Sequence, residues 1–140
     1  GIRNTSIYLY DILIMKNDKH IWDDKLPTAQ MLGRWQPWHN GHQKLFEEIL
    51  KKTGQVNIMV RDVKGVDDNP FDFETVKKNI FDALKDYKNR IKVTLVPNIT
   101  NICYGRGVGY KIEEIVLDEK TQQISATKIR EQMRKDGKLK

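Results

Sequence analysis

The stretch AQMLGRWQPWHNGH, residues 29–42, decides how the chain folds. It opens with a short apolar run that ends at a glycine, as a buried strand does before a turn. A helical pattern follows, because apolar residues recur at spacings of three and four from Leu45 to Leu50. The stretch therefore predicts a strand, then a loop that contains two histidines, and then a helix.

We expect this first helix over residues 41–53. Asn40 is the expected N-cap, and Gln43, three residues later, completes the pattern of a capping box. Gly54 is the expected stop, since glycine readily adopts the left-handed conformation that ends many helices.

The alternation of strands and helices continues along the chain. A second strand is predicted at residues 56–60 and a third at 91–96, and the helix between them is expected to be capped by Asp72 and to carry apolar residues as far as Tyr87. A fourth strand is predicted at residues 112–117. Such alternation predicts an α/β fold in which helices cover both faces of a parallel sheet and ligands bind at the carboxyl ends of the strands.

The composition favours one globular domain. The chain has 140 residues, of which 39% are hydrophobic and 31% charged, and a chain of this kind can bury enough apolar surface to fold. We assign residues 28–140 to this domain. Residues 1–27 fit the alternation least well, and they are expected to form an N-terminal extension, an edge strand at residues 7–14, or the remnant of a preceding domain.

Charge and apolar patterning restrict the class of partner. Lys and Arg outnumber Asp and Glu by 25 to 19, so the surface is expected to attract anions. The basic residues are scattered rather than interleaved with aromatics, so nucleic acid is not an expected partner.

A lone Cys103 excludes an internal disulfide framework and fits a reducing cytoplasm. No membrane partner is expected, because the apolar stretch at residues 7–15 is shorter than the roughly 20 residues of a membrane span.

The two histidines lie where a phosphate group would bind. A helix start presents unpaired backbone N–H groups and the positive end of the helix dipole, and Gly41 lets an anion approach the backbone without a Cβ in the way. His39 and His42 would add two donors at the same place. A packed turn or half of a zinc site are the alternatives, but neither accounts for two histidines at a helix start.

The string HNGH at residues 39–42 resembles the HxGH signature of the nucleotidylyltransferase superfamily. That superfamily also carries ISxTxxR near its C-terminal end, and residues 124–130 read ISATKIR. The resemblance implies a cytidylyltransferase-like domain with the fold of a Rossmann-like three-layer sandwich around a central parallel sheet. It also implies an enzyme that transfers a nucleoside monophosphate and releases pyrophosphate.

The second motif suits phosphate binding on physical grounds as well. Ser125 can cap a last helix, whose first-turn amides, together with the Thr127 hydroxyl and the Arg130 guanidinium, are suited to hold the β- and γ-phosphates. An ordinary capped surface helix is the alternative interpretation of this motif when it is taken alone.

Carried over residue by residue, the resemblance implies that two histidines and one arginine are catalytic: His39, His42 and Arg130. The nucleotide-binding residues that it implies come from both motifs and are Gly33, Arg34, Trp35, Gly41, Ser125, Thr127 and Arg130. Lys44 is a further candidate. No side chain is implied as a metal ligand, because the Mg²⁺ that family members commonly use bridges the triphosphate and prefers water and phosphate oxygens.

The substrates follow from the finer form of the first motif. GRWQPWHNGH is closer to the GRFQPxHxGH of the archaeal type of nicotinamide-mononucleotide adenylyltransferase than to the GTFDxxHxGH of most cytidylyltransferases, so ATP is favoured over CTP as the nucleoside triphosphate. The acceptor is expected to be a phosphorylated small molecule. Its phosphate is largely ionised at neutral pH and therefore needs no general base.

Three basic residues are candidates for binding the acceptor: Arg61 and Lys64, which follow the second strand, and Arg106 in a glycine-rich stretch. A charged, solvated loop is the alternative interpretation of the first two. The glycine-rich stretch does not match a dinucleotide fingerprint, because Tyr110 stands where the third glycine should be.

Other functions stay open at this point. They are a nucleotide-binding regulatory module without turnover, a cytidylyltransferase that uses CTP and an alcohol phosphate, and a basic nucleic-acid-binding domain. The sequence also leaves open whether the chain forms a homo-oligomer.

Overall fold

The computed structural model describes residues 12–107 and 109–140. Residues 7–11 of the expected edge strand lie outside the described residues. The remainder of that stretch is not a strand, because Ile12–Met15 forms the short 3-10 helix η1. Met15 is 2% exposed and belongs to the core.

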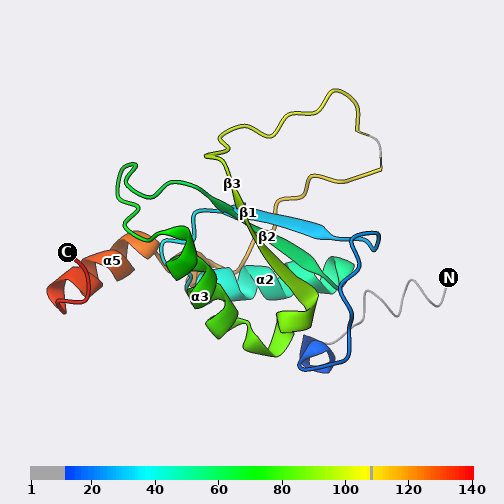
Figure 1. Ribbon diagram of the computed structural model, residues 1–140, viewed down its shortest axis with the longest axis horizontal. Helices are drawn as coiled ribbons and strands as arrows, with labels where there is room; N and C mark the ends of the chain where they lie inside the picture. Colours follow the sequence, from blue (N-terminus) through cyan, green and yellow to red (C-terminus); the bar gives the residue numbers. More distant parts are fainter. Residues whose placement is uncertain (1–11, 108) are drawn as a thin grey trace.

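Three parallel strands form the sheet, and all three were predicted (Figure 1). They are β1 (Ala29–Gly33), β2 (Val56–Arg61) and β3 (Ile91–Val96), in the order β1-β2-β3. The register places Ala29 opposite Val56 and Val56 opposite Ile91, so the three strands begin at the same level. Their carboxyl ends therefore reach the same edge of the sheet, where the loops after β1 and β2 meet.

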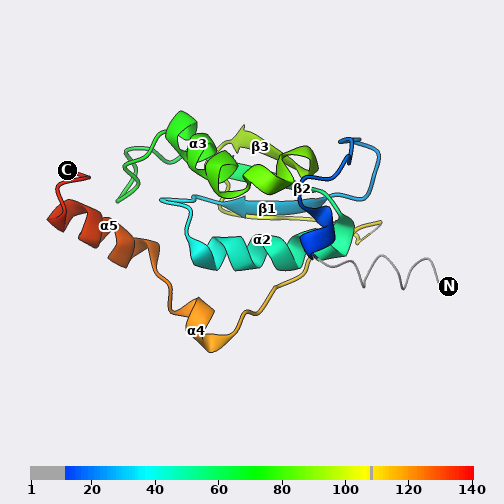
Figure 2. The same cartoon turned by 90° about the horizontal axis from the view of Figure 1, so that it is seen from below.

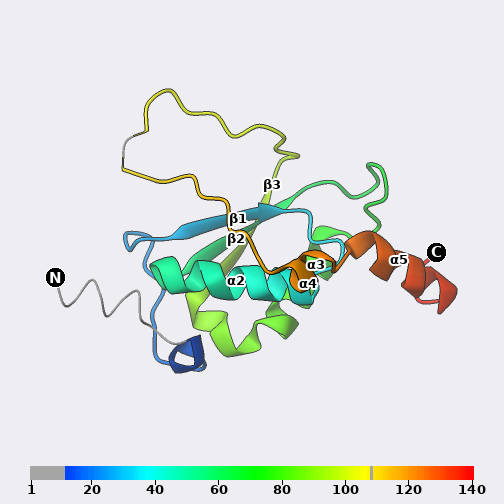
Figure 3. The ribbon, with the colours of Figure 1, turned by 180° about the vertical axis from the view of Figure 1, so that it is seen from behind.

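The two long helices pack on one face of this sheet. α2 (Asn40–Thr53) and α3 (Phe73–Ala83) both lie below β1 in Figures 1 and 3, and Figure 2, seen from below, shows α2 alongside β1 and α3 near β2 and β3. The described residues show helices on one face of the three-stranded sheet, so the expected second layer of helices is not confirmed. The reason is topological: two right-handed crossovers that advance in the same direction place their helices on the same side.

Alternate burial along β2 agrees with this arrangement. Val56, Ile58 and Val60 are at most 2% exposed, whereas the residues between them are only partly buried. The helices contribute the other half of the core through six side chains, each at most 8% exposed: Phe46, Ile49, Leu50, Val76, Ile80 and Leu84. The hydrophobic face of β2 is therefore enclosed, and its opposite face is not.

The predicted fourth strand is absent. Residues 112–117 have no regular secondary structure, and Ile112 and Val116 are 58% and 74% exposed. Only Ile115 packs against the core, while Glu113 pairs with Lys52 at 3.5 Å. The two neighbouring glutamates, Glu113 and Glu114, interrupt the apolar run. The chain follows the side of α2 here instead of pairing with β1.

The predicted helix that carries Tyr87 is shorter than expected. α3 begins after Asp72, whose side chain accepts a hydrogen bond from the Thr75 N–H, as predicted, but it ends at Ala83. The 3-10 helix η2 (Lys85–Arg90) follows, with non-helical backbone at Tyr87. Tyr87 is nevertheless buried, with its ring 5.6 Å from that of Phe46. The apolar pattern therefore continues through a change of helix type.

The described part of the N-terminal segment is tied to the sheet by buried polar contacts. Arg90, which is 7% exposed, donates to the Asp18 carboxylate, with Nε 3.1 Å from Oδ2, and to the Gly54 carbonyl at 2.7 Å. Gln55 is fully buried and donates to the Asp23 carbonyl and to the Thr28 hydroxyl, both at 2.7 Å. These contacts hold residues 18–28 against the amino ends of the strands.

The chain ends in two helices that follow a long exposed stretch. α4 (Glu119–Gln122) leads directly to α5 (Ala126–Lys135), which Ser125 caps as predicted. Within residues 12–107 and 109–140, no helix is long and apolar enough to cross a membrane.

We predict that Asp18→Asn lowers the free energy of unfolding by about 1–3 kcal/mol, because it removes the charge that compensates the buried Arg90 guanidinium. Chemical denaturation at neutral pH measures the change. Asp24→Asn is the matched control, since the Lys92–Asp24 pair is exposed (49% and 78%), and we expect it to leave stability nearly unchanged. Equal effects of the two substitutions would contradict the structural role of the Asp18–Arg90 pair.

Candidate active site

The loop after β1 is shaped by close packing between Gly33 and Trp35. A Cβ at Gly33 would lie 2.6 Å from the Trp35 indole, so only glycine fits beneath the ring. Trp35 has a φ of 55°, an unusual backbone conformation for a bulky residue. Its Nε1 donates to the Met59 carbonyl of β2 at 3.2 Å. These contacts hold the indole in a fixed position at the carboxyl end of the sheet.

The N-cap of α2 is His39, not the predicted Asn40. The Nδ1 atom of His39 accepts from the backbone N–H of Gly41 at 3.0 Å and from that of His42 at 3.4 Å. Asn40 is exposed and forms the first residue of the helix. An imidazole nitrogen therefore takes the role that a short polar side chain usually has at this position.

His42 completes the capping box in place of the predicted Gln43. Its Nδ1 accepts from the His39 backbone N–H at 3.2 Å, and the two imidazole rings are stacked with their centroids 3.6 Å apart. A neutral imidazole whose Nδ1 accepts a hydrogen bond carries its proton on Nε2. Both rings therefore keep Nε2–H as a donor for a ligand.

The environment of the two rings keeps them neutral. Burial, and then the neighbouring His39 ring, lower the pKa of His42 to about 3, and burial also lowers the pKa of His39. Protonation at Nδ1 would in addition remove an acceptor on which the helix cap depends. The Trp35 ring meets His42 edge-on at 4.7 Å, and the Trp38 ring lies 5.5 Å away, so two buried indoles enclose the imidazole.

Gly41 gives the capping box its necessary space. A Cβ at this position would lie 2.8 Å from His39 Cε1 and 3.0 Å from its Nδ1. The same point lies 3.6 Å from the Cβ of Ile124, the first residue of the second motif. The starts of α2 and α5 therefore approach each other at Gly41.

Arg130 makes the second contact between the two motifs. Its NH1 donates to the Gln36 carbonyl at 2.6 Å, although 94 residues separate the two in sequence. Its NH2 lies 3.3 Å from the Thr127 hydroxyl, and its Nε donates to Asp68 at 2.9 Å. The arginine side chain is only 10% exposed, so its position is fixed by these contacts.

The remaining residues of the second motif lie at the start of α5. The Ser125 hydroxyl accepts from the Lys128 N–H at 3.4 Å, while Thr127 is exposed. The structure thus brings the loop and helix start that carry Gly33, Trp35, His39, Gly41 and His42 next to the helix start that carries Ser125, Thr127 and Arg130, with contacts at Gln36 and near Gly41. Arg34 and Lys44 are exposed on the same loop and helix.

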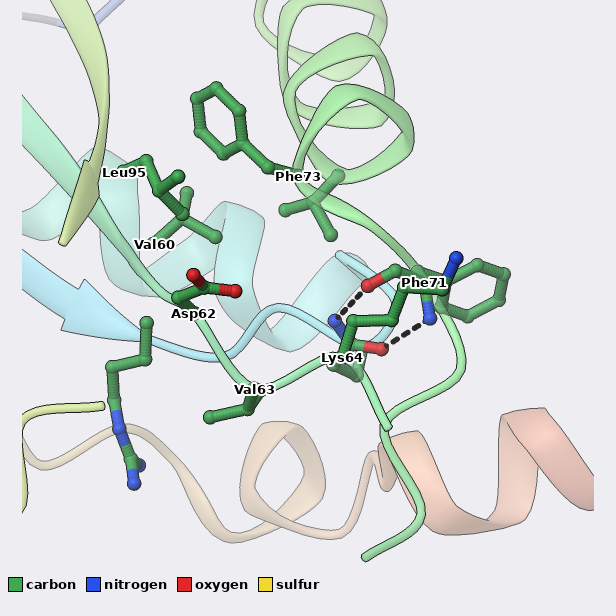
Figure 4. A pocket seen from close by; sticks show the side chains of 10 residues that line it. Val60, Asp62, Val63, Lys64, Phe71, Phe73 and Leu95 are labelled. Atoms are coloured by element: carbon green, nitrogen blue, oxygen red, sulfur yellow. Dashed lines mark hydrogen bonds between the residues drawn. The ribbon is translucent and has the colours of Figure 1, made fainter. Parts of the chain in front are cut away.

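Gln36 connects this site to a pocket next to it. Its buried side chain donates to the Phe71 carbonyl and accepts from the Phe71 N–H, both at 2.9 Å, in the manner of a paired strand. Figure 4 shows the pocket, which is lined by Asp62, Lys64 and Phe71 from the segment between β2 and α3 and by Phe73 from the start of α3. The pocket lies at the carboxyl end of β2, the side on which an acceptor was expected.

The three candidate acceptor residues are not equally placed. Arg61 and Lys64 both line the pocket, and Arg61 also donates to Asn98 at 2.7 Å. Its Nε is buried with no hydrogen-bond partner among the described residues. Arg106 lies in the exposed stretch after β3 and is not part of the pocket lining. Lys64 and Arg61 are thus the two basic residues among those that line this pocket.

Sequence reasoning missed three residues that organise the site: Gln36, Asp68 and Arg134. Asp68 lies in the segment between β2 and α3 and accepts from both Arg130 and Arg134. No local pattern marks these contacts, which span 35 to 94 residues. Among the described residues, no group of three or more His, Cys, Asp or Glu side chains is arranged to hold a metal ion.

Comparison with known proteins does not assign the chain to a family. No family model matches the sequence, and no match was found among curated proteins. The function is therefore inferred from the residues of the site.

We predict that His42→Asn weakens the dependence of stability on pH below about pH 6. An unfolded histidine titrates near about 6.5, whereas the pKa of folded His42 is about 3, so between these values the unfolded state binds a proton that the folded state does not. Stability is therefore lost as the pH falls through this window, with a slope from this group of up to about 1.4 kcal/mol per pH unit. Urea denaturation from pH 7 to pH 4.5 measures the slope in both proteins.

His42→Asn is chosen because its side-chain oxygen can replace Nδ1 as the acceptor of the cap. NMR titration of the wild-type ring provides a separate check, with His42 expected to stay neutral at pH 5. The same slope in both proteins, or a ring that protonates near pH 6.5, would refute the buried neutral imidazole.

Proposed function

We propose that the chain is a nucleotidylyltransferase that transfers AMP from ATP to a phosphorylated small-molecule acceptor and releases pyrophosphate. One observation carries the proposal: the segments that carry the HxGH and ISxTxxR motifs, far apart in sequence, meet in space. Arg130 donates to the Gln36 carbonyl, and Ile124 approaches Gly41 so closely that a Cβ on the glycine would lie 3.6 Å from the Cβ of the isoleucine. Two separate chance resemblances would have no reason to converge. The polyphosphate would lie where the starts of α2 and α5 approach each other.

The fold is suited to such a ligand. The unit β1-α2-β2-α3-β3 has the connectivity of one mononucleotide-binding half of a Rossmann-like fold, in which ligands bind beyond the carboxyl ends of the strands. The first amides of α2 and α5 and the positive ends of their dipoles favour an anion. The proposed fold family is therefore Rossmann-like, of which the described residues form two layers.

In the proposed reaction, an oxygen of the acceptor phosphate attacks the α-phosphorus of ATP. The bond between the α-phosphorus and the bridging oxygen of the β-phosphate breaks, and pyrophosphate leaves with the electron pair. No proton has to be removed, because the acceptor phosphate is already largely ionised at neutral pH. The protein's contribution is to position the two phosphates and to stabilise the charge that develops on them.

The two imidazoles supply that stabilisation as neutral donors. Their Nε2–H groups are left free by the capping box and are held in place by ring stacking and by the indoles of Trp35 and Trp38. Donors that need no reorganisation during the reaction are the most effective for a developing charge. Arg130, with Thr127 and Ser125, is assigned to the departing pyrophosphate.

The proposal includes Mg²⁺ as a companion of the triphosphate. The described residues offer no three-ligand cluster for it, and Mg²⁺ is commonly held by phosphate oxygens and water. When bound, the ion would supply positive charge to the triphosphate oxygens. The acceptor is assigned to the surface around the pocket beside Gln36, whose enclosed space of about 10 Å³ holds about one water-sized group, with Lys64 and Arg61 as its candidate basic residues.

We expect release of pyrophosphate when the protein is incubated with ATP, Mg²⁺ and a panel of phosphorylated acceptors, with a slower reaction when CTP replaces ATP. His42→Asn should lower turnover by about a hundredfold, as is typical when one preorganised donor to the transition state is lost. It should do so with little loss of stability at pH 7, because the substituted side chain preserves the cap.

Asn40→Ala is the control, because Asn40 lies between the two histidines but is exposed and does not cap the helix. Its turnover should stay close to that of the wild type. Binding of ATP with no pyrophosphate released from any acceptor would instead favour a regulatory nucleotide-binding module. Failure to bind any nucleoside triphosphate would rule out both functions.

A further inference from the structure

Two arginines of α5 hold a single carboxylate beside the proposed site. Arg130 and Arg134 are one helical turn apart, and both donate to Asp68: Arg130 Nε lies 2.9 Å from Oδ2, while Arg134 NH1 and NH2 lie 3.1 Å and 2.6 Å from Oδ2 and Oδ1. The geometry is that of a planar anion with two oxygens, bound by a pair of guanidinium groups. Arginine pairs of this kind recognise carboxylate and phosphate alike.

The two arginines stabilise the ionised form of the Asp68 carboxyl, although its side chain is not buried. Hydrogen bonds from Arg134 and Arg130 hold the pKa of its carboxyl well below the usual range, and its side chain is 46% exposed. It reaches α5 from the segment between β2 and α3, which has no regular secondary structure over residues 62–72. A partly exposed residue on such a segment can leave without disturbing the core.

The proposed pyrophosphate ligand and Asp68 compete for the same donor. Arg130 gives its NH1 to Gln36, its NH2 lies near Thr127, and its Nε points to Asp68. A polyphosphate next to Thr127 would bring several negative charges close to the carboxylate. Like charges at that distance repel, whereas the exchange of one anion for another keeps both guanidinium groups paired.

We propose that the Asp68 carboxylate takes the place of the terminal phosphate in the free protein, where it pairs with Arg130 and Arg134. The nucleoside triphosphate displaces it, and its terminal phosphate then pairs with both arginines. This inference rests on the proposed function. It adds Arg134 to the residues that bind the polyphosphate, and it makes Asp68 a competitor of the ligand rather than a part of its site. It also connects nucleotide binding to the 62–72 segment, which lines the acceptor pocket.

The alternative is that Asp68 permanently orients the two arginines for the ligand. The two roles predict opposite signs for Asp68→Asn, which removes the charge but keeps an acceptor oxygen. A competitor that is neutralised lets the polyphosphate bind more tightly, whereas an orienting residue that is neutralised weakens binding.

The test uses inorganic tripolyphosphate as the probe, with its dissociation constant measured by calorimetry on the full chain at one fixed ionic strength. We expect Asp68→Asn to tighten binding by about tenfold and Arg134→Gln to weaken it by about tenfold, each the size of one charge-assisted contact. Lys135→Gln is the matched control. It removes one positive charge from the same exposed turn of α5, and we expect it to change affinity by less than about twofold.

A second measurement needs no variant. The pKa of Asp68, followed by carbon NMR of its carboxyl group in the wild-type protein, should rise toward the usual value of about 3.9 when tripolyphosphate is added. A value that stays low in the complex would show that the carboxylate never leaves the arginines.

The outcomes separate the two proposals. If tripolyphosphate and ATP bind the wild type, and neither Asp68→Asn nor Arg134→Gln changes their affinity, the displacement of Asp68 is overturned and the proposed function stands. If Asp68→Asn weakens binding, the displacement of Asp68 is likewise overturned, the proposed function stands, and Asp68 orients the two arginines. No binding of either probe to the wild type would overturn both.

Discussion

The guanidinium of Arg130 joins three segments that are distant in sequence: the loop after β1 through the Gln36 carbonyl, the segment before α3 through Asp68, and its own helix near Thr127. The sheet and its two long helices do not by themselves determine where α5 lies, because α5 follows a long exposed stretch. A side chain that is 10% exposed and has three polar partners is costly to displace, because its N–H donors would then be buried without acceptors. Arg130 is therefore the main buried anchor of α5, and hence of the proposed polyphosphate site, beside the exposed Arg134–Asp68 pair and the approach of Ile124 to Gly41.

The proposed catalytic geometry and the folding geometry use the same atoms of the two histidines. Each Nδ1 accepts a backbone N–H at the start of α2, so each Nε2 keeps its hydrogen for a ligand. Gly33 and Gly41 are required for the same reason, because a Cβ at either position would collide with the aromatic ring that it supports. A site arranged in this way is preorganised, since helix formation itself orients the donors.

The local features of the fold were predictable from sequence, and the long-range ones were not. The positions of β1, β2 and β3, the stop at Gly54 and the caps at Asp72 and Ser125 follow from apolar periodicity and from residue preferences, and the structure confirms them. The N-cap of α2 was assigned wrongly because Asn ranks high at that position, whereas here an imidazole with a reciprocal partner replaces it. The apolar residues within 112–117 resemble a strand, but a strand forms only when it pairs with a neighbour, and local sequence does not encode that pairing. The contacts of Gln36 with Phe71 and of Asp68 with Arg134 span 35 and 66 residues, so neither leaves a local signature. The motif residues of the site were nominated from a resemblance, and their roles remain predictions.

A crystal structure of the protein with Mg²⁺ and a non-hydrolysable ATP analogue tests most directly whether the two motifs hold one polyphosphate. We expect the phosphates between the starts of α2 and α5, within hydrogen-bond distance of the Nε2 atoms of His39 and His42 and of the Arg130 guanidinium. An analogue bound elsewhere, or phosphates that touch only one of the two motifs, would contradict the assignment.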